Sequence, residues 1–210
     1  MGTARNAVGL KNNLFGLFKG EKGVKIIPRR LAGVYEIRLS PLHDHRGIFM
    51  RAYEESTFST YGIHQRWVHE NQSVTLKKGT IRGLHFQYEP FSETKLVRVV
   101  TGAVLDVFVD LRKDSPTFGQ WDSLELSEDT LSMVYIPRGF AHGFCTLCDH
   151  CTVLYKVDQV YTPTADSGIR WNDPSLAINW PTRDPILSSK DSNLPTLDMF
   201  VNQNKGIDAV

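Results

Sequence analysis

The sequence lacks long hydrophobic runs, an excess of charge of either sign and a recognisable targeting segment. No apolar stretch approaches the roughly 18 residues that a membrane-spanning helix needs. The first residues contain no apolar core followed by a small-residue cleavage site, which a secretory signal peptide would require. The formal net charge of +1 argues against nucleic acid or an anionic membrane as the main partner. We therefore expect a cytoplasmic protein that binds neither nucleic acid nor membranes.

Cysteine is also scarce, but the three cysteines are evenly spaced at Cys145, Cys148 and Cys151. This spacing, with histidines nearby, allows a zinc site of three cysteines and one histidine as one interpretation. An iron–sulfur cluster would need a fourth cysteine, which the sequence does not contain. The other interpretation is a strand, a turn at Asp149–His150 and a second strand whose buried thiols pack as small apolar groups. We favour the second interpretation and expect no disulfide framework.

Short apolar segments separated by Gly, Pro, Asp and Ser predict an all-β fold. In the clearest of them, Lys95–Leu111, two apolar strands flank a turn at Thr101–Gly102 and the second strand alternates with period two. Further strands are expected at 34–37, 45–52, 121–126, 132–136 and 152–157, and one short helix at 54–61. Many short strands without intervening helices are typical of a sandwich or a jelly roll.

The two ends of the chain differ from this central pattern. Residues 1–23 are rich in Gly, Asn and Lys and are expected to be an N-terminal tail outside the core. Residues 24–210 are expected to form a single jelly-roll domain. Its last part, from Trp180 onward, is rich in proline and is expected to wrap the barrel as irregular structure.

Two histidine motifs resemble the paired motifs of a cupin barrel. Pro137–Gly143 has the Pro-x-Gly-x-x-His order, which places His142 inside the barrel mouth. In the other motif a metal-binding cupin would have His-x-His, but here Gln87 follows His85 in place of the second histidine. A stable divalent metal site needs three or four protein ligands. We therefore predict a cupin-like barrel without a metal, in which His85 is free to transfer protons.

Long motifs in a fixed order extend over most of the chain. They are Gly79–Gln87, Lys95–Arg98, Asp106–Arg112, Ser115–Gly119, Ile136–Phe144, Trp171–Pro174 and Ser189–Asp191. Through these motifs the chain resembles the dTDP-4-dehydrorhamnose 3,5-epimerase family from about Val24 to Leu197. The resemblance implies a homodimeric jelly-roll isomerase, without a cofactor, that epimerises a nucleotide-linked 4-keto-6-deoxy sugar.

The chemistry of such an epimerase explains the residue types at the matching positions. A proton next to a ketone is weakly acidic, so its removal needs a base, an acid on the opposite face and a cation near the enolate oxygen. By resemblance, His85 is the base and Asp191 orients its ring. Tyr155 matches the proton donor, Lys95 is the cation for the enolate, and Arg82 is the partner of the diphosphate.

The chain departs from the family at the expected nucleotide pocket. In the family, an Arg-Gly-x-Phe-x-Glu strand reaches the nucleotide of the neighbouring subunit. Arg46 and Phe49 are kept, but Arg51 replaces the glutamate and His69 replaces a glutamine. Because arginine donates where glutamate accepts, the nucleotide need not be thymidine and the sugar can differ as well. The remaining predicted substrate-binding residues are Asn71, His142 and Lys190.

Three alternatives remain open from the sequence. The first is an epimerase that inverts only C3 or only C5 of a hexose or heptose linked to a nucleotide other than thymidine. The second is a metal-dependent cupin oxygenase, against which the missing ligand at Gln87 argues. The third is a non-catalytic sugar-binding β domain, which would not require an acid and a base at the positions of Tyr155 and His85.

Overall fold

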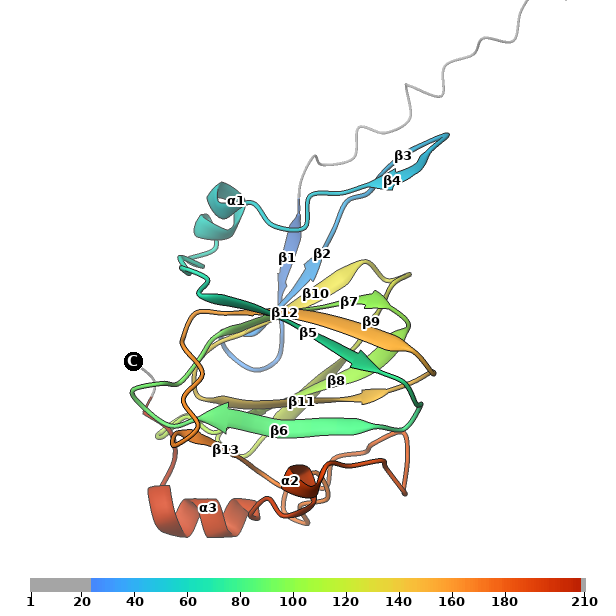
Figure 1. Cartoon of the computed structure of the whole chain (residues 1–210). Coiled ribbons are helices and arrows are strands. Elements are labelled where there is room, and N and C mark those ends of the chain that lie inside the picture. Colours follow the sequence, from blue (N-terminus) through green and yellow to red (C-terminus); the bar gives the residue numbers. More distant parts are fainter. Residues whose placement is uncertain (1–23, 209–210) are drawn as a thin grey trace, which may run out of the picture.

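Two antiparallel β-sheets packed face to face form the body of the structure, a computed structural model that describes residues 24–208 (Figure 1). The predicted N-terminal tail, residues 1–23, lies outside the described residues. The six-stranded sheet has the order β1-β2-β10-β7-β12-β5, and the five-stranded sheet has the order β13-β6-β11-β8-β9. This arrangement confirms the expected all-β, cupin-like jelly roll.

The strands are β1 (Lys25–Pro28), β2 (Tyr35–Arg38), β3 (Leu42–Asp44), β4 (Gly47–Phe49), β5 (His69–Thr75), β6 (Ile81–Gln87), β7 (Lys95–Thr101), β8 (Ala103–Asp110), β9 (Trp121–Ser127), β10 (Ser132–Ile136), β11 (Phe140–Thr146), β12 (Cys151–Val157) and β13 (Asp166–Gly168). The helices are α1 (Glu55–Ser59), α2 (Ser189–Ser192) and α3 (Leu197–Asn204). Within the described residues, no helix is long and apolar enough to cross a membrane.

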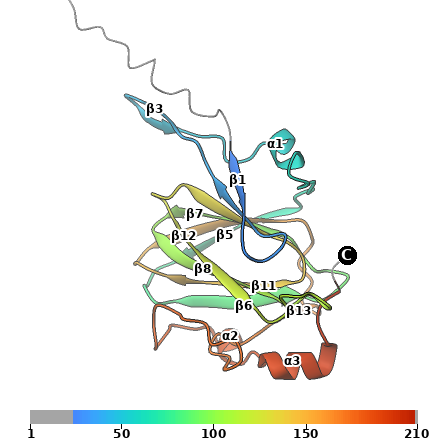
Figure 2. The ribbon, with the colours of Figure 1, turned by 180° about the vertical axis from the view of Figure 1, so that it is seen from behind.

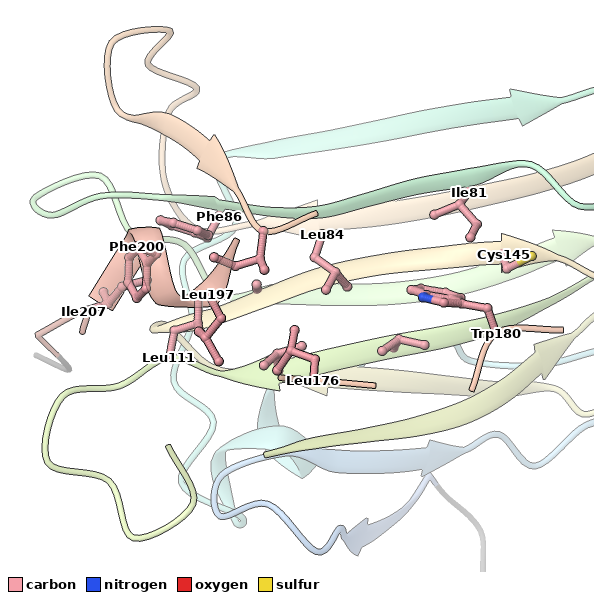
Figure 3. Close-up of a cluster of buried hydrophobic side chains, with 14 residues drawn as sticks. Ile81, Leu84, Phe86, Leu111, Cys145, Leu176, Trp180, Leu197, Phe200 and Ile207 are labelled. Carbon is pink, nitrogen blue, oxygen red and sulfur yellow. The ribbon is translucent and has the colours of Figure 1, made fainter. Parts of the chain in front are cut away.

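Three layers of apolar side chains hold the sheets together. The middle layer lies between the two sheets and includes Val97 and Val153 from one sheet and Phe108 and Phe144 from the other. A second layer packs the outer face of the five-stranded sheet against the C-terminal segment, as Figure 3 shows for Phe86 and its neighbours. The third layer packs α1 against the outer face of the six-stranded sheet. Burial on both faces explains why the central strands are so rich in apolar residues.

Most of the predicted elements are confirmed. The strands expected on either side of Thr101–Gly102 are β7 and β8, and the predicted strand 132–136 coincides with β10. The helix expected at 54–61 forms at Glu55–Ser59. The strand–turn–strand interpretation of the cysteine segment is also confirmed, because β11 and β12 flank the turn that contains His150.

The strand predicted over His45–Ala52 is confirmed only in its centre, as β4. It pairs with β3, which was not predicted, in a hairpin whose turn is closed by the Asp44 carboxylate accepting a hydrogen bond from the Arg46 amide at 2.8 Å. Gly47 follows with φ of 130°, a conformation that glycine adopts readily. Figure 1 and Figure 2 both show this hairpin projecting from the barrel on the side away from α2 and α3.

The prediction that the C-terminal segment is entirely irregular is wrong. The segment wraps the five-stranded sheet as expected, but it contains α2 and α3. Each helix begins at a hydroxyl side chain that accepts a backbone hydrogen bond. In α2 the Ser188 hydroxyl accepts from the Asp191 amide, and in α3 the Thr196 hydroxyl accepts from the Met199 amide. Phe200 of α3 is buried against Phe86. Both caps involve residues close together in the sequence and could have predicted the helices. The prediction of irregular structure relied on the proline content of the segment instead.

Candidate active site

Strand register places the predicted catalytic side chains on the two inner faces of the barrel. In an antiparallel sheet, directly paired residues point to the same face. Tyr155 of β12 is paired with Val97, a residue of the inner apolar layer, and with Asn71 of β5. Lys95 lies two residues from Val97 and therefore shares that face. The inner face of the six-stranded sheet thus carries the predicted acid and the predicted cation.

The opposite inner face carries the histidines. His85 of β6 is paired with His142 of β11, and Arg82 is paired with Phe144 of the inner layer. Arg82 and His85 are three residues apart, a spacing that would put them on opposite faces of a regular strand. Between the pairs His85–His142 and Arg82–Phe144, β6 contains one more residue than β11. This β-bulge brings the side chains of Arg82 and His85 to the inner face.

Gly83 allows this irregular pairing. Its φ is 125°, and a Cβ there would lie 2.5 Å from the Gly143 Cα and 2.7 Å from the His142 carbonyl oxygen. A larger residue would separate β6 from β11 at the point where His85 and His142 are aligned. The glycines of the two histidine motifs therefore set the position of the histidines.

His85 and Asp191 form a hydrogen-bonded pair. Nε2 of His85 lies 2.6 Å from Oδ1 of Asp191, whose residue is 3% exposed, whereas the His85 side chain is 31% exposed. The amide of Gly83 donates to Oδ2 of the same carboxylate at 3.4 Å. Burial alone would raise the pKa of Asp191, but the hydrogen bond and charge of His85 outweigh it and lower that pKa. Asp191 is therefore ionised at neutral pH, and its contribution to stability is lost only as the pH falls through the lowered value.

A second histidine–aspartate pair lies beside the first. Nε2 of His142 is 2.9 Å from Oδ2 of Asp106 on β8, and both residues are buried. The other carboxylate oxygen of Asp106 has no hydrogen-bond partner. A buried carboxylate with one free oxygen is costly unless a charged or donating group faces it. His142 is thus held by a residue that sequence reasoning did not assign to the site.

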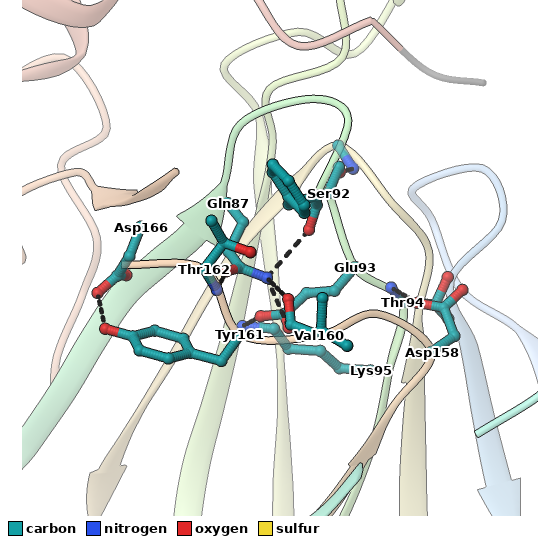
Figure 4. A network of polar contacts seen from close by, with 12 residues as sticks. Gln87, Ser92, Glu93, Thr94, Lys95, Asp158, Val160, Tyr161, Thr162 and Asp166 are labelled. Atoms are coloured by element: carbon teal, nitrogen blue, oxygen red, sulfur yellow. Dashed lines mark hydrogen bonds and ion pairs between the residues drawn. The ribbon is translucent and has the colours of Figure 1, made fainter. Parts of the chain in front are cut away.

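Lys95 is held by a polar network at the end of the barrel (Figure 4). Its ammonium lies 3.1 Å from Oε1 of Glu93, and both side chains are largely buried. The other oxygen of Glu93 accepts from the Gln87 amide at 3.3 Å. Gln87 also donates to the Phe91 and Val160 carbonyls at 3.0 and 3.2 Å.

Gln87 is therefore a structural residue here. Its side-chain oxygen accepts from the Thr162 amide at 2.7 Å, so both ends of its amide are hydrogen-bonded to the protein. In a metal-binding cupin this position would carry a histidine ligand. Among the residues that the structure describes, no three His, Cys, Asp or Glu side chains are grouped as a metal site would need. The three cysteines thus form no such group, and Cys145 packs in a different apolar layer from Cys151.

Tyr155 faces the histidines from the opposite sheet. Burial raises the pKa of its phenol, the nearby Glu93 raises it further, and Arg82 lowers it. The net increase keeps the phenol protonated at neutral pH. Arg82 itself is anchored to the six-stranded sheet, since its Nε donates to Oγ1 of Thr75 at 3.1 Å. A donor on one wall and a basic ring on the other is an arrangement suited to proton transfer across a bound molecule.

The remaining predicted site residues do not all join this cluster. Asn71 and His69 lie on the inner side of β5, paired with Tyr155 and Val157. Lys190 is next to Asp191 in α2, and its ammonium pairs with Asp166.

Arg46, Phe49 and Arg51 lie on or just after the projecting hairpin. Arg46 pairs with Asp44, and Arg51 pairs with Glu54. Within one chain, this hairpin does not contribute to the cluster around His85.

Sequence reasoning missed three residues that position the site. They are Asp106, which holds His142; Glu93, which holds Lys95; and Thr75, which holds Arg82. Only Asp106 carried a signal, because it is a charged residue on the inward side of an apolar alternating strand. Thr75 depends on a contact across the two sheets that only the folded chain creates, whereas Glu93 lies two residues before Lys95 and belongs to none of the motifs.

Comparisons with known proteins agree with this geometry. Residues 28–199 match the family model described as dTDP-4-dehydrorhamnose 3,5-epimerase. The enzyme of that name from Methanothermobacter thermautotrophicus is 44% identical over 172 residues, which are 80% of this chain and 92% of the relative. A dTDP-4-dehydrorhamnose 3-epimerase from Streptomyces niveus is 38% identical over 171 residues, covering 81% of this chain and 82% of that one.

A solved structure shows the same fold. The dTDP-4-dehydrorhamnose 3,5-epimerase of Bacillus anthracis, with TDP and PPi bound, is similar to this chain with a TM-score of 0.82 and 47% identity. The likeness covers 83% of this chain and all (100%) of that one. The family match spans well over half of the sequence, and the motifs that carry it build the two facing walls described above. The chain belongs to the dTDP-4-dehydrorhamnose 3,5-epimerase family.

Proposed function

We propose that this protein inverts C3 and C5 of a nucleotide-linked 4-keto-6-deoxy sugar, with His85 as the base and Tyr155 as the acid. The observation that carries the proposal is their placement on facing walls of one barrel, with His85 bonded to a buried carboxylate and Tyr155 held protonated. The Bacillus anthracis relative was solved with TDP bound, which supports a nucleoside diphosphate as the group to which the substrate's sugar is linked.

The proposed reaction moves one proton at a time. His85 removes the proton from the carbon beside the ketone, and the electron pair moves onto the ketone oxygen to give an enolate. The Lys95 ammonium stabilises the charge on that oxygen. Tyr155 then protonates the carbon from the opposite face, which inverts it. Solvent removes the proton from His85 and restores the proton of Tyr155, so the enzyme returns to its starting state.

The neighbouring residues set up this chemistry. Asp191 holds the His85 ring in one orientation and stabilises its charged form, and is a positioning residue in this scheme. Arg82 binds the diphosphate with its fork of donors. His142 commits one ring nitrogen to Asp106, which leaves the other to bind the substrate. Lys190 and Asn71 lie beside Asp191 and Tyr155 and complete the proposed substrate contacts.

A single-carbon epimerase is the second candidate. The Streptomyces niveus relative is named as a 3-epimerase, and it shares 38% of its residues with this chain in the aligned region. Inversion at C3 alone and inversion at both C3 and C5 would use the same base and acid. They would differ in how the sugar ring lies between His85 and Tyr155.

We further propose that the active form is a homodimer in which the β3–β4 hairpin completes the partner's site. The hairpin exposes Leu42, Ile48 and Phe49, which are 68%, 51% and 67% accessible. Such an apolar hairpin is unfavourable in water unless another surface covers it. The strand β5 is one edge of the six-stranded sheet, exposes Val74 and leaves one side of its backbone unpaired, so it offers a surface that a partner can cover.

This assembly gives the hairpin residues a function. Carried to the partner, Arg46, Phe49 and Arg51 would meet the nucleotide near His69 and Asn71 of β5. Arg51 offers hydrogen-bond donors at the position where the family has a carboxylate. It would therefore favour a nucleotide base that presents carbonyl oxygens.

Replacing His85 with Asn should lower kcat on the order of a hundred- to ten-thousand-fold, because the amide cannot take the proton. Binding of the nucleoside diphosphate should change only a few-fold, since Arg82 and the fold are intact. The assay is turnover of a thymidine-linked 4-keto-6-deoxy sugar, with binding measured by calorimetry. His150→Asn, in the exposed β11–β12 turn, is the control. Near-native turnover by the His85 variant would exclude this residue as the base.

Asp191→Asn should lower kcat by about two to four orders of magnitude while KM stays within a few-fold. The amide can still occupy the space but cannot stabilise a charged imidazole. Asp198→Asn, an exposed residue of the same C-terminal segment, should behave as the native enzyme. Steady-state kinetics and circular dichroism of both variants provide the measurement. A kcat that is unchanged in folded Asp191→Asn would show that His85 acts without its partner.

The hairpin proposal predicts complementation between two inactive chains. One chain carries His85→Asn, and the other carries Arg46→Ala with Phe49→Ala. In a heterodimer purified through two different tags, the second chain has an intact centre and receives an intact hairpin from the first. That heterodimer should recover about half of the native activity, because one of its two sites is complete. Recovery of no activity, or a fully active monomer, would refute the exchange of hairpins.

A further inference from the structure

The turn between β11 and β12 holds two cysteine thiols next to each other, outside the site described above. Sγ of Cys148 lies 3.5 Å from Sγ of Cys151. A covalent S–S bond is about 2.05 Å long, so the sulfurs need to approach by only about 1.5 Å. Both are free cysteines in the structure. The third cysteine, Cys145, is buried in the other apolar layer, beside Trp180 (Figure 3).

The surrounding turn maintains this separation. The Asp149 carboxylate, between the two cysteines, accepts from the Lys78 amide at 2.8 Å. His150 adopts φ of 58° and donates its amide to the Leu76 carbonyl at 3.2 Å. Cys151 lies at the first position of β12, where the ladder to β5 begins. Both ends of the turn are therefore fixed to neighbouring backbone.

Gly102 provides the space that the two sulfurs occupy. A Cβ at this position would lie 2.9 Å from the Sγ of Cys148 and 2.9 Å from the Sγ of Cys151. Its φ of 77° is also one that glycine adopts readily. The absence of a side chain in the β7–β8 turn thus allows the thiol pair to pack against the barrel end.

The two thiols differ in access to solvent. Cys148 is partly exposed, whereas Cys151 is fully buried and directs its Sγ toward the Ala103 and Cys148 carbonyls at 3.2 and 3.3 Å. Burial raises the pKa of Cys151, so this thiol stays protonated at neutral pH. Cys148 is the thiol that a dissolved reagent reaches first, and Cys151 is placed to react second.

We propose that Cys148 and Cys151 form a reversible dithiol–disulfide site that reacts with small-molecule disulfides such as glutathione disulfide. The Cys148 thiolate attacks the reagent, forms a mixed disulfide and releases one small thiol. The Cys151 sulfur then attacks Sγ of Cys148, forms the internal disulfide and releases the second small thiol. The protein loses two electrons and two protons, and the reagent gains them as its two thiols.

Exposure of the full-length native protein to glutathione disulfide, followed by intact-mass and peptide analysis, tests the proposal. The native chain should lose the mass of two hydrogen atoms and yield a linked Cys148–Cys151 peptide, and dithiothreitol should reverse the change. Cys145→Ala should behave in the same way. Cys151→Ala should stop at a glutathione adduct on Cys148, and Cys148→Ala should give neither product. Circular dichroism establishes that each variant is folded.

Three results would overturn the proposal. One is a native chain that keeps a stable glutathione adduct without forming the internal bond. Another is loss of the reaction in Cys145→Ala, which would assign the chemistry to a different thiol. The third is stoichiometric zinc that is bound through Cys148 and Cys151 and blocks the reaction, which would make the pair a metal site.

Discussion

The hydrogen bond between His85 and Asp191 is the interaction on which the rest of the site depends. It joins β6 of the five-stranded sheet to a four-residue helix more than a hundred positions later, over a distance of 2.6 Å. The Asp191 carboxylate is buried, and a buried carboxylate needs hydrogen-bond donors to replace the water that it has lost. The C-terminal segment therefore has to wrap the outer face of this sheet, and α2 begins with a capped turn that presents Asp191 to β6.

The barrel places the His85–Asp191 pair opposite a second set of ionisable side chains. Strand register directs His85, His142 and Asp106 inward from one sheet and Lys95 and Tyr155 inward from the other. His85, His142 and Lys95 are each paired with a carboxylate, which fixes their positions before any substrate binds. Preorganised groups of this kind act on a developing charge without having to reorient, and this accounts for much of the rate enhancement in many enzymes. The irregular pairing at Gly83 is what allows Arg82 and His85 to share one face.

Sequence alone predicted the fold class and most of the strands, because period two, turn residues and apolar content depend on neighbours in the chain. It also identified His85, Asp191 and Tyr155 through motif resemblance, and the structure brings His85 and Asp191 into contact. The strand expected over His45–Ala52 is shorter than predicted, because the Asp44 side chain closes a turn that alternation does not reveal. Thr75 was not found, because its role arises from a contact between β5 and β6 of the two sheets. Glu93 was not found either, although it lies only two residues before Lys95. The hairpin residues form no site within one chain, and their predicted role in the nucleotide pocket depends on the proposed homodimer.

The central claim is that a base and an acid act on the sugar from opposite faces, and Tyr155→Phe tests it most directly. The variant is incubated with a thymidine-linked 4-keto-6-deoxy sugar in deuterated water, and NMR locates deuterium and the configuration at C3 and C5. With the base intact and the acid removed, we predict that deuterium still exchanges into the starting sugar while net inversion falls by about two orders of magnitude or more. Equal loss of exchange and inversion would contradict the account, because Tyr155 would then position the substrate and not protonate it.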